Sequence, residues 1–170
     1  MDLKSYMREI QDFPIPGILF RDITTVLKDP AALVCAIDSM VKLVDGLDFD
    51  SVLGPESRGF IFGVPLAYKM GKGFVPVRKA GKLPAEVAKK EYALEYGTAT
   101  IEIHKDAIKP GQRFIIADDL LATGGTAKAV VDLIEEMGGI VVAHLYFIEL
   151  TGLEGRKALA GQDIRAVLRY

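Results

Sequence analysis

The stretch 114-FIIADDLLATGGTAKAVVDLI-134 decides the fold of this chain. It opens with the apolar run Phe114 to Ala117, which is typical of a buried strand. Two aspartates and a Thr-Gly-Gly-Thr turn follow, and then apolar residues recur at helical spacing, at Ala127, Val130, Val131 and Ile134. A strand that runs through a glycine-rich turn into a helix is typical of an α/β domain, whose site lies at the carboxyl ends of parallel strands.

Patterns on either side of this stretch extend the same architecture. Apolar runs predict strands over 51–53, 74–77, 114–117, 140–148 and 164–168, and helical periodicity predicts helices over 30–45, 59–70, 125–137 and 152–159. Thr151 and Glu154 have the spacing of a capping box for the last helix. Alternation over 91–96 and 98–104, around Gly97, predicts a hairpin. We therefore expect one domain over residues 1–170, with a mostly parallel central sheet flanked by helices.

The N-terminal residues, 1–29, are expected to stand apart from this alternation. Apolar residues at helical spacing predict a short amphipathic helix, at Leu3, Tyr6, Met7 and Ile10. The segment FPIPGILFRDI, residues 13–23, then carries two prolines and a glycine, which predict extended, irregular backbone. Backbone groups that secondary structure leaves unused are available to a ligand.

Composition and charge narrow the class of protein. The 170 residues are 50% hydrophobic and 26% charged, with a formal net charge of −2, which predicts a globular domain with an apolar core. A near-neutral chain argues against nucleic-acid binding, which requires a basic face. The single cysteine, Cys35, excludes an intramolecular disulfide framework and favours a reducing, cytoplasmic compartment. Since no signal-like or membrane-length apolar run occurs, we expect neither secretion nor a membrane partner.

The turn within 114–134 has the chemistry of a sugar-phosphate site. Gly124 and Gly125 let backbone N–H groups converge on an anion, and the helix that follows directs its positive end to the same place. Thr123 and Thr126 add hydroxyl donors around that position. The adjacent carboxylates of Asp118 and Asp119 suit a vicinal diol or a hydrated metal. The alternative is a solvated strand end followed by a tight turn before a helix.

A local basic segment complements this turn. Residues 72–90 carry six cationic side chains against Glu86 alone, a net charge of +5, so the remainder of the chain carries −7; the cations are Lys72, Arg78, Lys79, Lys82, Lys89 and Lys90. Such a segment attracts a polyanion. The alternative is an ordinary solvated face.

Five segments of the sequence resemble a known family. ADDLLATGGT, residues 117–126, resembles the signature by which purine phosphoribosyltransferases bind 5-phosphoribosyl pyrophosphate (PRPP). FPIPGILFRDI (13–23), GPESRGF (54–60), RKAGKLP (78–84) and LEYG (94–97) resemble, in that order and spacing, the adenine-specific branch of the family. The resemblance covers nearly the whole chain. One departure is in the GPESRGF segment, where several members carry Asp or Ala around the position of Glu56 or Ser57.

The resemblance implies a type I phosphoribosyltransferase fold and a pentosyltransferase of purine salvage, which converts PRPP and adenine into AMP and pyrophosphate. It assigns PRPP to Glu56, Ser57, Arg58, Arg78, Lys79, Lys82, Asp118, Asp119, Ala122, Thr123, Gly124, Gly125 and Thr126. It also implies Mg²⁺, held mainly by PRPP oxygens and water rather than by protein ligands, and a cytoplasmic homodimer.

Base recognition and catalysis are assigned by the same resemblance. Backbone groups of Leu19 and Arg21 would read the adenine edge while Phe20 stacks on its face, unless Phe20 is a core anchor. Glu95 would take or relay the purine proton, with Arg58, Asp118 and Asp119 as the other catalytic residues. The basic loop and hairpin, residues 78–104, would form a flap; the alternative is an apolar strand face at Tyr92, Leu94 and Tyr96.

Two rival functions share the PRPP site. An enzyme specific for hypoxanthine, guanine or xanthine is disfavoured by segments 13–23 and 94–97. A PRPP-sensing regulator without catalysis usually needs a further nucleic-acid-binding region, for which the motif segments leave no room.

Overall fold

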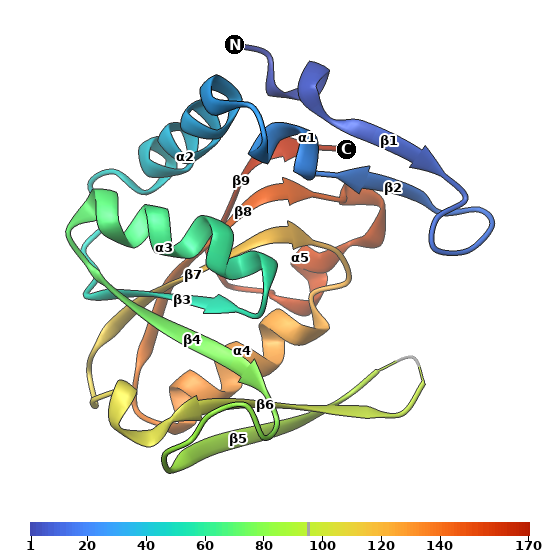
Figure 1. The fold of residues 1–170 in the computed structure, drawn as a ribbon. Helices are drawn as coiled ribbons and strands as arrows, with labels where there is room; N and C mark the ends of the chain where they lie inside the picture. Colours follow the sequence, from blue (N-terminus) through green and yellow to red (C-terminus); the bar gives the residue numbers. More distant parts are fainter. Residues whose placement is uncertain (95) are drawn as a thin grey trace. The chain divides into compact units, whose positions relative to one another are not determined.

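The computed structural model describes residues 1–94 and 96–170, and these residues fall into two compact units, 1–39 and 40–170. The first unit holds a short 3₁₀ turn, an antiparallel hairpin and helical residues; its elements are η1 (Leu3–Tyr6), β1 (Arg8–Gln11), β2 (Leu19–Asp22), α1 (Thr24–Leu27) and the first part of α2 (Pro30–Val44). In the hairpin, drawn in blue in Figure 1, Ile10 lies opposite Phe20. The helix predicted over 30–45 is confirmed.

The N-terminal amphipathic helix is a wrong prediction. Only Leu3–Tyr6 form a turn, and Arg8–Gln11 form a strand instead. An isolated helix of two turns is marginal because its first turn fixes several residues for one hydrogen bond, whereas pairing with β2 satisfies the backbone of β1 at once. The extended backbone predicted for 13–23 is confirmed at Leu19–Asp22, but these residues form strand β2 and not an irregular segment.

The second unit is built on a large mixed sheet. Its strands are β3 (Ser51–Pro55), β4 (Gly73–Lys79), β5 (Val87–Ala93), β6 (Thr98–His104), β7 (Arg113–Leu121), β8 (Ile140–Glu149) and β9 (Ile164–Arg169). Among the described residues the order is β5-β6-β4-β3-β7-β8-β9. The five strands from β4 to β9 in this order are parallel, and β6 and β5 extend the sheet as an antiparallel hairpin. The predicted hairpin and the predicted mostly parallel α/β fold are confirmed.

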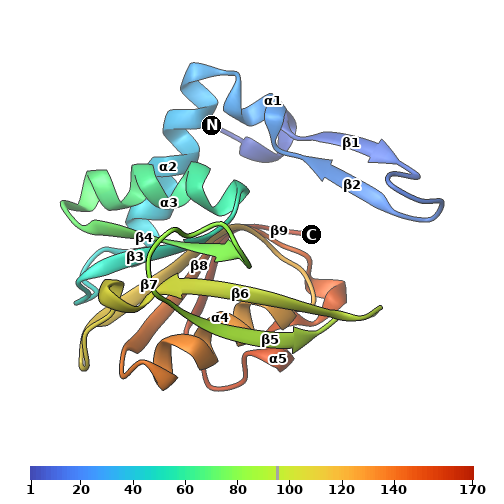
Figure 2. The same cartoon turned by 60° about the horizontal axis from the view of Figure 1, so that its bottom comes forward.

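Helices cover both faces of this sheet. Helix α3 (Arg58–Met70) follows β3 and packs on β3, β7 and β4, while α4 (Gly125–Glu136) follows β7 and packs on β5 and β8. Figures 1 and 2 show the two helices on opposite faces. Shorter helices complete the unit: η2 (Lys105–Ala107), η3 (Thr151–Leu153) and α5 (Gly155–Ala158).

The capping box expected near residue 151 is absent from the described structure. Glu154 has a left-handed φ of 54°, and the Thr151 hydroxyl donates to the Tyr170 carbonyl at 2.7 Å rather than to a helix. Residues 151–158 therefore form a 3₁₀ turn and a single helical turn instead of the continuous helix predicted over 152–159.

The core lies between the sheet and its helices. Strand β3 is buried along its whole length, as expected for a central parallel strand. A cluster of buried apolar side chains fills the face under α4, including Leu53, Ile116, Val130, Ile134 and Tyr146. No helix among the described residues is long and apolar enough to cross a membrane.

The sheet topology fixes where a ligand site is expected. The chain crosses from β3 outward to β4, but from β7 it crosses in the opposite direction to β8. This reversal leaves a crevice at the carboxyl ends of β3 and β7, which is where open α/β sheets bind ligands.

Candidate functional site

A cavity of about 280 Å³ lies at this crevice. Residues that follow β3 form one wall, and the end of β7 with the start of α4 forms the other. The lining residues are Pro55, Glu56, Arg58, Asp118, Asp119, Leu120, Leu121, Ala122, Thr123, Gly124, Gly125, Thr126, Ala127 and Tyr146. The carboxylate pair and the glycine-rich turn singled out in the sequence therefore share one cavity with Arg58.

The turn before α4 forms one end of the cavity. Gly124 precedes the helix with a left-handed φ of 84°, a conformation that glycine adopts without steric cost. A Cβ at Gly124 would lie 2.7 Å from the Gly155 carbonyl oxygen and 3.0 Å from the Ala158 Cβ. The turn is thus held against α5, and the backbone N–H groups at the start of α4 meet the cavity. This is the arrangement that binds anions at helix N-termini.

The acidic pair stands beside this turn. Asp119 is buried, and its carboxylate forms an ion pair with the Arg58 guanidinium at 2.8 Å. The Asp119 backbone N–H donates to the Asp118 carboxylate at 2.8 Å. Burial raises the pKa of Asp118 well above its ordinary value, and the neighbouring charge of Asp119 raises it further. Burial also raises the pKa of Asp119, while Arg58 opposes that shift. The pair thus has a higher proton affinity than free carboxylates.

The Glu56 carboxylate binds two residues on the cationic side of the site, Arg78 and Lys79. This carboxylate accepts hydrogen bonds from the Lys79 backbone N–H at 2.7 Å and from Arg78 Nε at 3.0 Å. The Lys79 N–H bond, together with Arg78, lowers the pKa of Glu56, so this carboxylate is ionised at neutral pH. Glu56 also lines a second cavity of about 140 Å³, together with Arg78, Lys79, Tyr92 and Thr126.

The other residues predicted for PRPP have different positions. Ser57 precedes α3 without a side-chain cap, and the Glu56–Ser57 peptide is cis. Lys82 is exposed in the loop after β4, outside the residues that line the two cavities. The predicted catalytic Glu95 lies outside the described residues.

The residues predicted to recognise the base lie on the hairpin of the first unit. Leu19, Phe20 and Arg21 belong to β2, where Phe20 packs edge-to-face on Phe13 at 5.1 Å and Arg21 pairs with Glu9. In a two-stranded ribbon each strand keeps one unpaired edge. Leu19 and Arg21 are two residues apart, so their backbone groups point to the same side of β2.

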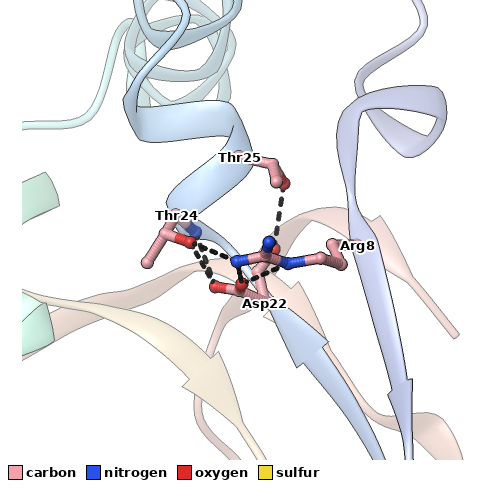
Figure 3. A network of polar contacts seen from close by, with 4 residues as sticks. All are labelled: Arg8, Asp22, Thr24 and Thr25. Carbon is pink, nitrogen blue, oxygen red and sulfur yellow. Dashed lines mark hydrogen bonds and ion pairs between the residues drawn. The ribbon is translucent and has the colours of Figure 1, made fainter.

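A polar network fixes the end of this strand (Figure 3). The Asp22 carboxylate accepts hydrogen bonds from Arg8 Nε at 2.8 Å, from the Thr24 backbone N–H at 2.9 Å and from the Thr24 hydroxyl at 2.7 Å. The Thr25 hydroxyl donates to the Asp22 carbonyl at 3.2 Å. The hydrogen bonds from Thr24, aided by Arg8, lower the pKa of Asp22 to about 2. Asp22 thereby ties both hairpin strands to the start of α1.

Sequence reasoning gave no site role to two tyrosines that line the cavities. Tyr146 lies opposite Asp118 in the β7–β8 register and lines the larger cavity, with its hydroxyl 3.2 Å from His144 Nδ1. Tyr92 lines the smaller cavity, and its hydroxyl lies 3.1 Å from Thr126 Oγ1. The signal for Tyr92 was present, because the alternation over 91–96 places it on one strand face. Nothing local to either tyrosine identifies its partner.

These groups together suit a polyanionic sugar. The turn before α4 offers N–H and hydroxyl donors to a phosphate, the acidic pair offers acceptors to hydroxyl groups, and Arg58, Arg78 and Lys79 supply positive charge on the opposite side.

Comparison with known proteins connects this site to a family. The family described as the phosphoribosyl transferase domain matches residues 24–159. An adenine phosphoribosyltransferase from Lachnoclostridium phytofermentans is 59% identical over 168 residues, which cover 99% of this chain and 97% of that protein. The crystal structure of adenine phosphoribosyltransferase from Thermoanaerobacter pseudethanolicus is 54% identical, with a TM-score of 0.96 over 99% of this chain and 98% of that one. The Saccharomyces cerevisiae enzyme, solved with adenine and an iminoaltritol bisphosphate, is 38% identical, with a TM-score of 0.92 over 98% and 97%.

Proposed function

This chain belongs to the phosphoribosyltransferase family, and we propose that it is an adenine phosphoribosyltransferase. It transfers the 5-phosphoribosyl group of PRPP to N9 of adenine and releases AMP and pyrophosphate, as a pentosyltransferase of purine salvage. The full-length likeness to adenine-specific relatives supports the choice of base. The observation that carries the chemistry is the cavity in which an anion-binding turn, an acidic pair and Arg58 meet.

The phosphate, sugar and pyrophosphate parts of PRPP can each be assigned to a part of the site by charge. We assign its 5-phosphate to the turn at 122–126 and its ribose hydroxyls to Asp118 and Asp119. We assign its pyrophosphate to the basic side of the site, at Glu56, Ser57, Arg58, Arg78, Lys79 and Lys82. The ion pair between Arg58 and Asp119 supports this division, because it keeps the cation that faces the leaving group next to the carboxylate that holds the sugar.

The reaction separates charge at the sugar. As the bond between C1 of the ribose and the pyrophosphate oxygen breaks, positive charge develops on the ribose ring and negative charge on the departing oxygens. The acidic pair is close enough to Arg58 to form one preorganised electrostatic site, which stabilises developing charge without reorganisation. N9 of adenine then bonds to C1 and loses its proton, for which we propose Glu95 as the acceptor or relay.

A magnesium ion fits this donor set. The described residues provide no group of three or more His, Cys, Asp or Glu side chains that would form a protein cage, but Asp118 and Asp119 are adjacent to the cavity. Magnesium retains waters and binds readily through substrate phosphates with few carboxylates. When bound with PRPP, it would neutralise charge on the pyrophosphate. Asp118 and Asp119 would orient the ribose oxygens and magnesium-bound water.

We propose that the hairpin of the first unit recognises adenine. The backbone groups of Leu19 and Arg21 point to the same side of β2, and Phe20 supplies an aromatic face. A backbone carbonyl that accepts from the exocyclic amine favours adenine, because hypoxanthine presents an oxygen at the same position.

Assembly and location belong to the same proposal. We expect a cytoplasmic homodimer of a single phosphoribosyltransferase domain. Exposed apolar side chains on one face of α3 support self-association, namely Ile61, Val64 and Tyr68, of which Tyr68 is 86% exposed.

One assay tests the proposed activity. The purified chain is mixed with Mg²⁺ and PRPP, adenine, hypoxanthine or guanine is added separately, and nucleotide and pyrophosphate are quantified. We expect AMP and pyrophosphate in equal amounts with adenine alone. Product from an oxopurine would overturn the assignment of residues 19–21, and PRPP binding without any product would overturn the enzymatic function.

A further inference from the structure

A hydroxyl contact joins the β5–β6 hairpin to the anion-binding turn. Tyr92 lies near the end of β5, and its phenolic oxygen is 3.1 Å from Thr126 Oγ1. Thr126 is the second residue of α4, at the end of the turn that faces the larger cavity. The two residues are 34 positions apart in the sequence, so the contact is set by the packing of β5 on α4.

Contacts of its own ring and of a neighbour on the same strand hold Tyr92 in place. The strand alternates in burial, and the inward face carries Ala88, Lys90 and Tyr92. The Tyr92 ring packs against the hydrophobic core, and Lys90 forms an ion pair with Glu136 at the other end of α4. The hairpin is thus attached to both ends of the same helix, and the phenol reaches Thr126 from a supported position.

When an anion is bound, the number of protons and lone pairs on each group determines which of the two hydroxyls donates in this hydrogen bond. A threonine hydroxyl has one proton to donate and two lone pairs to accept with, and a phosphate only accepts. If the Thr126 proton points to the phosphate, its oxygen must accept from Tyr92. The chain Tyr92 to Thr126 to phosphate then runs in one direction, and each bond polarises the next.

We infer that Tyr92 is a positioning residue for the 5-phosphate of the substrate: its hydroxyl donates to Thr126 Oγ1 and thereby directs the Thr126 hydroxyl proton into the phosphate site. The inference rests on the proposed function, since that function supplies the 5-phosphate. It assigns to the last residues of β5, beside the turn of the hairpin, a role in ligand affinity. The alternative is that Tyr92 only packs against the core.

The test uses variants that change hydroxyls and preserve shape. Tyr92→Phe keeps the packed ring, Thr126→Val removes the acceptor, and Thr126→Ser retains it. Tyr6→Phe makes the same chemical change on a half-buried residue of η1 in the first unit, outside the two cavities, and serves as the matched control. Dissociation constants are measured by calorimetry for AMP and ribose 5-phosphate, which carry the 5-phosphate, and for pyrophosphate, which does not. Melting temperatures confirm that each variant is folded.

We expect Tyr92→Phe to weaken the binding of AMP and ribose 5-phosphate by about tenfold, as loss of one hydrogen bond in a chain to a charged group predicts. Pyrophosphate binding should be unchanged in this variant, and the binding of all three ligands should be unchanged in Tyr6→Phe. In the Thr126→Val background the tyrosine change should have no further effect, and Thr126→Ser should bind AMP nearly as well as the unmodified chain. Unchanged AMP binding in Tyr92→Phe, equal weakening of pyrophosphate, or additive effects in the double variant would each overturn the inference. If the unmodified chain makes no AMP from PRPP and adenine, the proposed function itself fails, which is a distinguishable result.

Discussion

Replacing Gly124 by alanine tests whether the anion-binding turn is held by packing as well as by its own backbone. Gly124 has a φ of 84°, and an added Cβ would lie 2.7 Å from the Gly155 carbonyl oxygen. The obstacle is backbone, which cannot rotate away as a flexible side chain would. The turn or α5 must therefore move to accommodate the methyl group.

Two costs add in the Gly124→Ala variant. A left-handed conformation costs an alanine about 1–2 kcal/mol, and forcing a methyl group into a packed contact costs about 1–3 kcal/mol. The free energy of unfolding should fall by about 2–5 kcal/mol in total. At about 2–4 °C per kcal/mol for a chain of this length, the melting temperature should fall by roughly 4–20 °C.

Gly125→Ala is the matched control, because a Cβ there meets nothing within 4 Å and the residue begins helix α4. Its melting temperature should stay the same or rise slightly, since alanine favours helix over glycine. Thermal unfolding of both variants is followed by circular dichroism, and PRPP affinity by calorimetry. Gly124→Ala should also lose PRPP affinity, because its turn is displaced. Equal melting temperatures for Gly124→Ala and the unmodified chain would refute the reasoning, as would a greater loss in Gly125→Ala.

Three further predictions concern charge in the second unit. Asp119→Ala should lower the turnover number by about 100-fold or more, as loss of a positioned polar group does in other sites. The control Asp132→Ala removes only an ion pair with Lys128 and should leave the turnover number unchanged. Equal turnover numbers for the two variants would exclude Asp119 from the mechanism. Hydrogen bonds from Arg156 lower the pKa of the buried Glu149, so the stability that this carboxylate contributes is present above its unfolded-state pKa and is lost as the pH falls. Glu149→Gln should therefore reduce the free energy of unfolding by about 1–3 kcal/mol at pH 7. In urea titrations, the difference between this variant and the unmodified chain should shrink toward pH 4. Burial lowers the pKa of His144 to about 4, so the unfolded chain binds this proton more readily, and the free energy of unfolding should fall as the pH drops from about 6.5 to about 4. This fall is at most about 1.4 kcal/mol per pH unit, and His144→Gln should make it shallower. An unchanged slope in the variant would contradict the assignment.

The amino-acid sequence by itself determined the central strand-turn-helix. The apolar run at 114–117, the two glycines and the helical spacing after them are local features, and each acts within a few residues. The same holds for the parallel α/β class, because alternating strands and helices leave few other topologies. The acidic pair and the basic segment 72–90 could also be found from residue types alone.

Only the tertiary structure decided which of these groups act together. Arg58 meets Asp119, Glu56 meets Arg78 and Lys79, and Tyr92 meets Thr126 because of strand order and the packing of β5 on α4, which no short stretch encodes. Pairing also overrode the weak helical pattern at residues 3–10, since a strand partner at 19–22 satisfies backbone groups that a two-turn helix leaves open. Local periodicity specifies elements, whereas contacts between distant residues depend on the edges and faces those elements present to one another.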